Sequence, residues 1–429
     1  MPQLDQSSVV ANELERVLPV VPTLFDYDDR FYTKIEKRQV EVVSKRDMRI
    51  PLEIYPGGMS GGFDSNGGDL GLGNGPTFDK GVINTNDMVH RVQWTAQADW
   101  ATDDSRKAVL NTFRHLLANA MKEFRRNVDS WCMTDGTGVM ATVSAVSTSG
   151  GKDTVTCNLA GDGFGVRLLR YGNAYSVYDS TLATRRTFTG APSSVPAGEA
   201  PIDLYDLANK QVRFNGTTGA TVSGDKIVVS GQTATPPVWI FGVPYHHNAA
   251  STGTWLGLDR STIPPIRANQ VAASGALSLP FPRLALNKIG DRVGIDNMKK
   301  TLACLHPCQK QAYEQLGQLV SIIHKQAKDE ALDLYFGDGM QLAGAPIYES
   351  YSWDKTRIDF VSVDVWGRAE MHPAGFYTNN EGRKIWEIRG SSGGVAASSI
   401  FYITASFNLF VNNPAVCSYI SGLTVPTGY

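Results

Sequence analysis

Residues 89–138 read VHRVQWTAQADWATDDSRKAVLNTFRHLLANAMKEFRRNVDSWCMTDGTG. Polar and mostly apolar side chains alternate over residues 89–98, which predicts a strand with one buried face. Apolar residues then recur at three- and four-residue steps over 104–131, as on one side of an amphipathic helix. The stretch therefore predicts a strand, a single long helix and a tight Asp-Gly-Thr-Gly turn at 135–138.

The predicted helix is long enough to need a sheet beneath it. A rise of 1.5 Å per residue gives it a length of about 40 Å. Its apolar stripe includes Phe113, Leu117, Met121, Phe124 and Trp131, and the turn consists of Asp135, Gly136, Thr137 and Gly138. Basic residues occupy much of the other side, where we expect a solvated face whose orientation stays open: Arg106, Lys107, Arg114, Lys122, Arg125 and Arg126.

Composition excludes several classes of protein. With 429 residues and 42% hydrophobic content, the chain can bury more than one core. Its 40 basic and 42 acidic residues give a net charge of −2, so no global field draws it to nucleic acid or to a membrane surface. No apolar run is long enough to cross a bilayer and no signal peptide is evident, so we expect a cytoplasmically made protein without membrane contact. Five scattered cysteines indicate reduced thiols.

A glycine-rich segment precedes the strand and helix. Residues 57–75 contain nine glycines among nineteen residues. Ordering such a chain costs much backbone entropy, so we expect the segment to be mobile unless a neighbouring subunit covers it. The N-terminal region has little core of its own and is expected to behave as an arm.

The remainder of the chain predicts a mixed α+β protein. Short alternating runs bounded by Gly, Asp and Asn predict a small barrel or sandwich; they lie at 143–146, 154–157, 166–171, 175–178, 212–214 and 226–229. The C-terminal half predicts helices at 283–292 and 307–320 and strands at 301–305, 357–363, 399–411 and 415–420.

No catalytic, cofactor or metal site is predicted. Ser60 and Ser392 stand in Gly-x-Ser-x-Gly patterns, but neither has the strand before it and helix after it that a nucleophile elbow requires. Cys304, His306 and Cys308 lack the second ligand pair of a structural zinc site. The pair at 246–247, His-His, is expected in a solvated loop.

Several motifs, taken in chain order, resemble one family. They are the strand, long helix and Asp135-Gly136-Thr137-Gly138 turn, then Leu305-His306-Pro307 before a helix, Gly344-Ala345-Pro346-Ile347 at a strand entry, and Asn413-Pro414-Ala415 between the closing strands. This order is similar to that of the major capsid proteins of tailed bacteriophages, with the Hong Kong 97-like fold.

The resemblance implies an N-terminal arm (1–38), an extended loop with flanking strands (39–98), the peripheral-domain spine helix and turn (99–140), and an axial domain with the remaining peripheral-domain strands (236–429). The β-rich segment between them exceeds the minimal fold of the family and is expected to be an inserted domain (141–235). The glycine-rich segment becomes the tip of the extended loop. Inter-subunit contacts are then expected at Gly57, Phe63, Leu70, Phe78 and Lys80.

The function implied is structural. The resemblance implies a non-enzymatic subunit, without a cofactor, that assembles as hexamers and pentamers into an icosahedral virion capsid in the host cytoplasm and encloses double-stranded DNA without sequence specificity. It also implies a separate scaffolding protein and a portal, and leaves decoration proteins open. No cleaved N-terminal scaffolding segment and no lysine–asparagine cross-link are expected. The alternatives are an encapsulin-like nanocompartment shell and, from another class, a serine hydrolase using Ser60 or Ser392.

Overall fold

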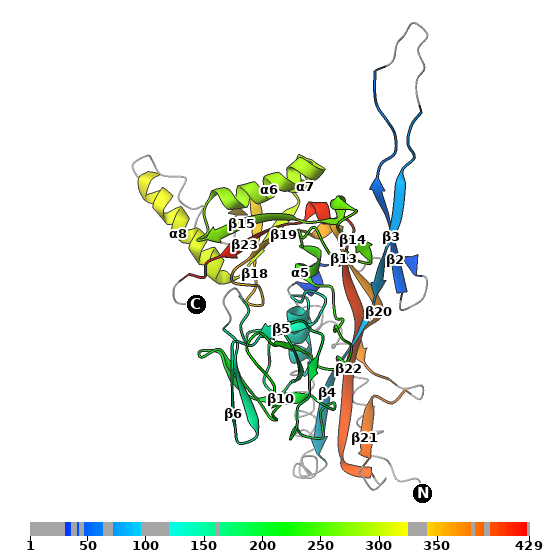
Figure 1. The fold of residues 1–429 in the computed structure, drawn as a ribbon, viewed down its shortest axis with the longest axis vertical. Helices are drawn as coiled ribbons and strands as arrows, with labels where there is room; N and C mark the ends of the chain where they lie inside the picture. Colours follow the sequence, from blue (N-terminus) through cyan, green and yellow to red (C-terminus); the bar gives the residue numbers. More distant parts are fainter. Residues whose placement is uncertain are drawn as a thin grey trace, which may run out of the picture.

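The computed structural model describes residues 31–35, 41–42, 47–62, 72–95, 120–158, 163–324, 341–378, 382–389 and 395–426. Helices and strands are mixed, as the α+β prediction requires. The molecule is elongated, with a β-hairpin projecting from one end (Figure 1). Residues 1–30 and 36–38 of the N-terminal arm, the first part of the predicted spine helix, and the predicted residues Phe63, Leu70, Phe113, Leu117 and Ser392 lie outside the described residues.

A four-stranded antiparallel sheet forms the long axis of the body. Its central strand β22 (Val395–Val411) pairs along one edge with β4 (Asn86–Thr95), and along the other with β20 (Trp366–Phe376) and β21 (Ile385–Arg389). The predicted strand at 89–98 is therefore confirmed over 89–95 and starts three residues earlier, while 96–98 lie outside the described residues. Alternate β22 side chains, including Phe401, Ile403, Phe407 and Leu409, are buried on one face of the sheet.

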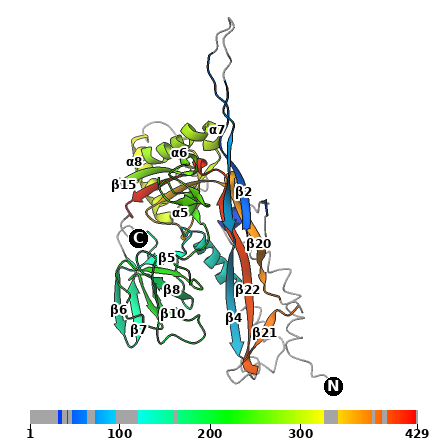
Figure 2. The same ribbon diagram turned by 45° about the vertical axis from the view of Figure 1, so that its right-hand side comes forward.

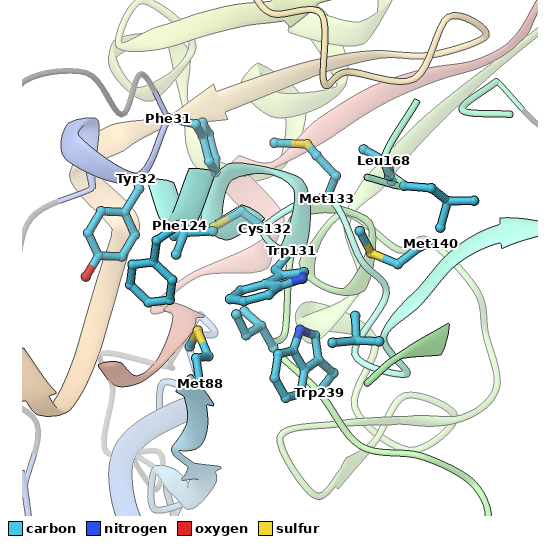
Figure 3. Packing of buried hydrophobic residues seen from close by; sticks show 14 of the residues in the cluster. Phe31, Tyr32, Met88, Phe124, Trp131, Cys132, Met133, Met140, Leu168 and Trp239 are labelled. Atoms are coloured by element: carbon cyan, nitrogen blue, oxygen red, sulfur yellow. The ribbon is translucent and has the colours of Figure 1, made fainter. Parts of the chain in front are cut away.

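The helix over residues 120–131 covers this buried face. Met121, Phe124 and Trp131 of the predicted stripe are all buried. The Phe124 ring lies 6.3 Å from that of His90 on β4, and the Trp131 ring meets Trp239 edge-on at 5.5 Å. Figure 3 shows Phe124, Trp131 and Trp239 gathered together with Met88 and Met140. One buried cluster thus joins the sheet, the helix and the β-rich region.

The basic side of this helix is not solvated throughout. Lys122 and Arg126 are exposed as expected, but Arg125 is only 4% exposed and is therefore a buried residue. The buried apolar residues of this helix follow the 3.6-residue period, and Arg125 lies beside Phe124 at the edge of the stripe that they form. The expectation of solvation was wrong at this position.

The β-rich region forms one sheet with the pairing order β5-β12-β8-β10-β11-β7-β6, and β9 adds to β8. The strands are β5 (Val139–Thr142), β6 (Ala145–Ser149), β7 (Lys152–Thr156), β8 (Ala174–Tyr178), β9 (Arg185–Arg186), β10 (Ala200–Asp206), β11 (Gln211–Phe214) and β12 (Lys226–Val229). The first and last of these strands pair with each other, so the chain enters and leaves the region side by side. The β-rich region lies beside β4 and β22 (Figure 2).

One predicted strand of this region is wrong. Residues 166–171 form turns, although Val166, Leu168 and Leu169 are buried. The Arg170 guanidinium donates to the carbonyl oxygens of Arg167 (2.5 Å) and Leu169 (3.0 Å). These bonds satisfy backbone acceptors that would otherwise need a strand partner.

A six-stranded mixed sheet, β15-β23-β19-β16-β18-β17, carries three helices. Its strands are β15 (Asn269–Gly275), β16 (Thr301–Leu305), β17 (Gln341–Leu342), β18 (Ala345–Glu349), β19 (Ile358–Ser362) and β23 (Ser418–Leu423); the helices are α6 (Pro280–Val293), α7 (Ile295–Met298) and α8 (Pro307–His324). The predicted strand at 301–305 is confirmed residue for residue. Ala285, Leu286 and Ile289 seat α6 on a second buried cluster.

Candidate assembly surfaces

The projecting hairpin consists of β2 (Asp47–Tyr55) and β3 (Thr77–Asn84), with β1 (Glu41–Val42) paired to the base of β2. Pairing runs from Asp47↔Asn84 to Tyr55↔Thr77. Only the base is packed: Val82 N–H donates to the Leu256 carbonyl oxygen at 2.9 Å, in the turn between β13 (Thr254–Trp255) and β14 (Leu258–Asp259). The rest extends away from the body (Figures 1 and 2).

Glycine at position 57 lets the two arms of the hairpin stay close beyond their last strand pair. A Cβ on Gly57 would lie 2.5 Å from Pro76 N and 2.8 Å from Asn74 O. The next residue, Gly58, has φ +104° and donates its N–H to Asn74 O at 2.7 Å. The close approach at Gly57 leaves no room for a side chain, and the positive φ at Gly58 is one that residues with a side chain rarely adopt. Part of the glycine content expected to be mobile therefore has a defined geometric role.

The projecting hairpin exposes large apolar side chains. Leu72 is 93% exposed, Met59 71% and Phe78 66%. Lys80 is also exposed, and within the described part of the chain nothing packs over this end of the hairpin. A two-stranded hairpin is marginally stable in water by itself, and apolar groups gathered on one projection indicate an interaction surface. Phe78 and Lys80 are thus available for contact, and their role as contacts stays a prediction.

An apolar groove lies where the hairpin leaves the body. It has a volume of about 1110 Å³ and separates β2 from the end of α6. Along residues 50–55, β2 pairs with β3 alone among the described strands, so its other edge faces this groove with free backbone groups. Its lining includes Leu52, Ile54, Trp255, Ile266, Val293 and Phe410.

A second apolar surface lies on the outer face of the four-stranded sheet, opposite the 120–131 helix. Tyr377, Trp386 and Tyr402 surround a shallow hollow of about 670 Å³, with Val89 and Ile400 beside them. The Tyr377 and Trp386 rings are 5.9 Å apart, and Tyr377 is 48% exposed. Aromatic groups of this kind are enriched at protein interfaces.

The Asp-Gly-Thr-Gly segment is a turn to which the chain returns at Trp239, after the β-rich region. Thr137 N–H donates to Asp135 Oδ1 at 3.1 Å, and Trp239 N–H donates to the Gly136 carbonyl oxygen at 2.7 Å. Gly136 and Gly138 have φ +92° and +72°, and a Cβ on Gly138 would lie 3.0 Å from Trp239 Cβ. The geometry therefore favours a structural role for this turn, at the end of the 120–131 helix.

The two adjacent histidines are buried, so the expectation of a solvated loop was wrong. His246 closes α5 (Val243–His246), and both His246 and His247 have 0% exposure. Trp255 Nε1–H donates to His246 Nδ1 at 3.0 Å, and His246 Nε2 contacts the Leu409 carbonyl oxygen at 3.2 Å. Because Nδ1 accepts, the proton of the neutral ring resides on Nε2.

His247 joins a buried carboxylate hub centred on Asp359 of β19. His247 Nδ1 and Trp353 Nε1 each lie 2.9 Å from an Asp359 carboxylate oxygen, and Arg357 donates from Nη2 at 2.7 Å. Burial alone would raise the pKa of Asp359, but the Arg357 charge and the His247 hydrogen bond outweigh it and hold the pKa at about 2. The carboxylate is therefore ionised inside the core. Its partners are separated from it by up to 112 residues, which is why sequence reasoning missed them.

Acid is expected to destabilise the chain through His246. Burial lowers its pKa to about 3, whereas the unfolded residue titrates near 6.5. The unfolded chain therefore binds a proton that the folded chain does not, and stability is lost from pH 6.5 down to about 3, by up to ~1.4 kcal/mol per pH unit. Urea unfolding at a series of pH values measures this slope. His246→Gln should reduce the slope by about one proton, and an unchanged slope would contradict the assignment.

The remaining candidate residues, Cys304, His306, Cys308 and Ser60, do not form a metal or catalytic site. Cys304 and Cys308 are fully buried, and His306 Nδ1 accepts from the Cys308 backbone N–H at 3.0 Å, opening α8. Among the described residues no group of three His, Cys, Asp or Glu side chains could hold a metal ion. Ser60 lies in the exposed segment after β2, and residues 60–62 and 72–76, the described residues that follow it before β3, contain no helix. No helix of the described residues is long and apolar enough to cross a bilayer.

Comparison with known proteins gives likeness of structure alone. No family model matches the chain, and no curated protein sequence matches it. Solved structures similar to it include phage capsids. The cyanophage A-1(L) capsid asymmetric unit has 11% identity and a TM-score of 0.49, over 94% of this chain and 93% of that chain. The mature capsid of bacteriophage PhiM1 has 10% identity and a TM-score of 0.44, over 92% and 87%. The procapsid of satellite phage P4, which includes a size determination protein, has 10% identity and a TM-score of 0.41, over 95% and 91%.

Proposed function

We propose that this chain is the structural subunit of an icosahedral capsid with the Hong Kong 97-like fold, assembling as hexamers and pentamers around double-stranded DNA. The observation that carries the proposal is the uncovered hairpin of β2 and β3. Its exposed apolar side chains have no packing partner among the described residues, so a second copy is the simplest source of one. A hairpin on one side of the subunit and receptive surfaces elsewhere make a heterologous contact, which closes into rings.

The receptive surfaces are the groove beside β2 and the aromatic hollow around Tyr377 and Trp386. Both are apolar; the hollow lies on the four-stranded sheet apart from the hairpin, whereas the groove has β2 as one of its walls. Many such contacts per shell add through effective concentration, so each can be weak. The near-zero net charge favours association between copies of the subunit, because they approach one another without strong repulsion.

The β-rich region is proposed to be an inserted domain displayed outside the shell. Pairing of β5 with β12 supports an insertion, because the region starts and ends at one place. The backbone bond from Trp239 to Gly136 brings the returning chain to the turn from which it left. A separate scaffolding protein and a portal are proposed partners, and the virion, assembled in the host cytoplasm, is the proposed location.

Electron microscopy of the purified full-length chain, with and without its scaffolding protein, tests the proposal. We expect rings or closed shells. A species that stays monomeric at all concentrations under both conditions would refute it. The content of shells recovered from the producing cell distinguishes a capsid from an encapsulin-like compartment. Packaged DNA supports the capsid, whereas shells filled with cargo enzymes would make the chain an encapsulin-like compartment.

A further inference from the structure

Three lysines surround one hollow at the start of β16. Lys34 ends the short helix η1 (Tyr32–Lys34), and Lys299 and Lys300 directly precede the strand. All three side chains are exposed. The hollow has a volume of about 390 Å³, and its floor consists of Thr301, Leu302, Pro346 and Val363.

The charge of this hollow is only partly neutralised. Lys300 Nζ lies 3.6 Å from Asp364 Oδ2, and both side chains are more than half exposed (58% and 65%), so water screens the pair. Lys34 places its ammonium 5.1 Å from the centre of the Tyr348 ring. Lys34 and Lys299 make no ion pair with another described residue. A chain with a net charge of −2 thus concentrates positive charge at one place.

We propose that this lysine hollow (Lys34, Lys299 and Lys300) binds the phosphodiester backbone of duplex DNA. The proposal rests on the proposed function, since it names the surface through which the subunit meets the enclosed DNA. Duplex DNA is a dense, regular polyanion with one charge per about 1.7 Å of axis. Ammonium groups contact phosphate as point charges, without the bidentate geometry by which arginine reads guanine.

The surroundings of the lysines predict binding without sequence preference. Leu302, Pro346 and Val363 offer no pair of side-chain donors and acceptors for a base edge. The Tyr348 ring beneath Lys34 is 8% exposed, so it cannot serve as a stacking platform. Three contacts per subunit are weak individually, but a shell presents many copies of the hollow.

The test is the salt dependence of DNA binding by the full-length protein. Fluorescence anisotropy of a labelled duplex is measured between about 50 and 200 mM salt. Each lost phosphate contact reduces the slope of log K against log salt by about 0.9. The triple variant Lys34→Gln, Lys299→Gln and Lys300→Gln should therefore flatten the slope by up to about 2.7. Because the three side chains are exposed, we expect an unchanged thermal midpoint.

Two matched variants complete the test. Arginine at the same three positions keeps the charges and should keep the slope, whereas glutamine at Lys122, Lys226 and Lys384 removes three charges elsewhere and should leave the slope unchanged. An unchanged slope in the hollow variant, or an equal loss in the matched variant, overturns the proposal. If the hollow variant loses as much affinity for poly-glutamate as it loses for DNA, the proposal is also overturned, in favour of an acidic protein partner. Shell formation by the hollow variant is scored separately, so that failure of DNA binding is distinguishable from failure of assembly.

Discussion

Removal of the hairpin tip is expected to leave a folded subunit that assembles at least about a hundredfold less well. The variant replaces residues 57–75 by an Asn-Gly turn, which suits a two-residue hairpin loop. It deletes Met59 and Leu72, and burying two such side chains at an interface contributes about 3 kcal/mol, equivalent to a hundredfold in affinity. The base of the hairpin, anchored by Val82 on Leu256, is retained. Sedimentation velocity measures assembly, and thermal unfolding measures the fold.

A point variant with a matched control sharpens this experiment. Leu72→Ser removes an apolar group from the hairpin, and Leu207→Ser removes one from the β-rich region, where Leu207 is 54% exposed. Only the hairpin variant should weaken assembly. Normal assembly by the tip deletion would remove the hairpin from the proposed contact. Equal weakening by both leucine variants would show that general surface apolarity, and not the hairpin, drives association.

Replacement of Asp359 by alanine is expected to lower the free energy of unfolding by about 3–5 kcal/mol. The change leaves the buried donors of His247 and Trp353 and the part-buried guanidinium of Arg357 without this acceptor, and Arg357 without its counter-charge. Removing one partner of a buried ion pair has costs of this size because the remaining charge stays desolvated. Urea unfolding, or the thermal midpoint where refolding is incomplete, measures the loss.

The control for this variant is Asp364→Ala. Asp364 also pairs with a cation, Lys300, but its side chain is 65% exposed, so we expect a change of at most about 0.5 kcal/mol. The stability that Asp359 contributes is present above the unfolded pKa near 3.8 and is lost as the pH falls toward about 2. Similar losses for the two aspartates would mean that the hub does not hold the fold together.

Local pattern predicted much of the architecture. Alternation placed β4, an apolar run placed β16, and the 3.6-residue period placed Met121, Phe124 and Trp131 in the core. The failures have a common cause. The run at 166–171 was apolar enough for a strand, but the carbonyl groups of Arg167 and Leu169 are satisfied by the Arg170 side chain instead of a neighbouring strand. Which partner satisfies a backbone group depends on atoms that the local pattern does not contain.

Among the candidate contacts, the sequence predicted the glycine-rich tip but not what surrounds it. The groove beside β2 unites residues from positions 50 to 415, and the aromatic hollow unites Val89 with residues 377–404. The lysine hollow brings together Lys34 and Lys299, which lie far apart in the sequence. No spacing rule links such distant positions.

The sequence by itself determined the elements whose causes lie within a few residues: the amphipathic helix, the alternating strands and the turn whose glycines adopt positive φ. Tertiary structure alone decided which polar groups are buried. His246 and His247 look like solvent-exposed residues in a Gly- and Asn-containing stretch, yet Leu409 and Asp359, 163 and 112 residues away, make them core residues. The physical reason is that periodicity reports which face of an element is apolar, whereas the partner that compensates a buried charge comes from wherever the chain folds back.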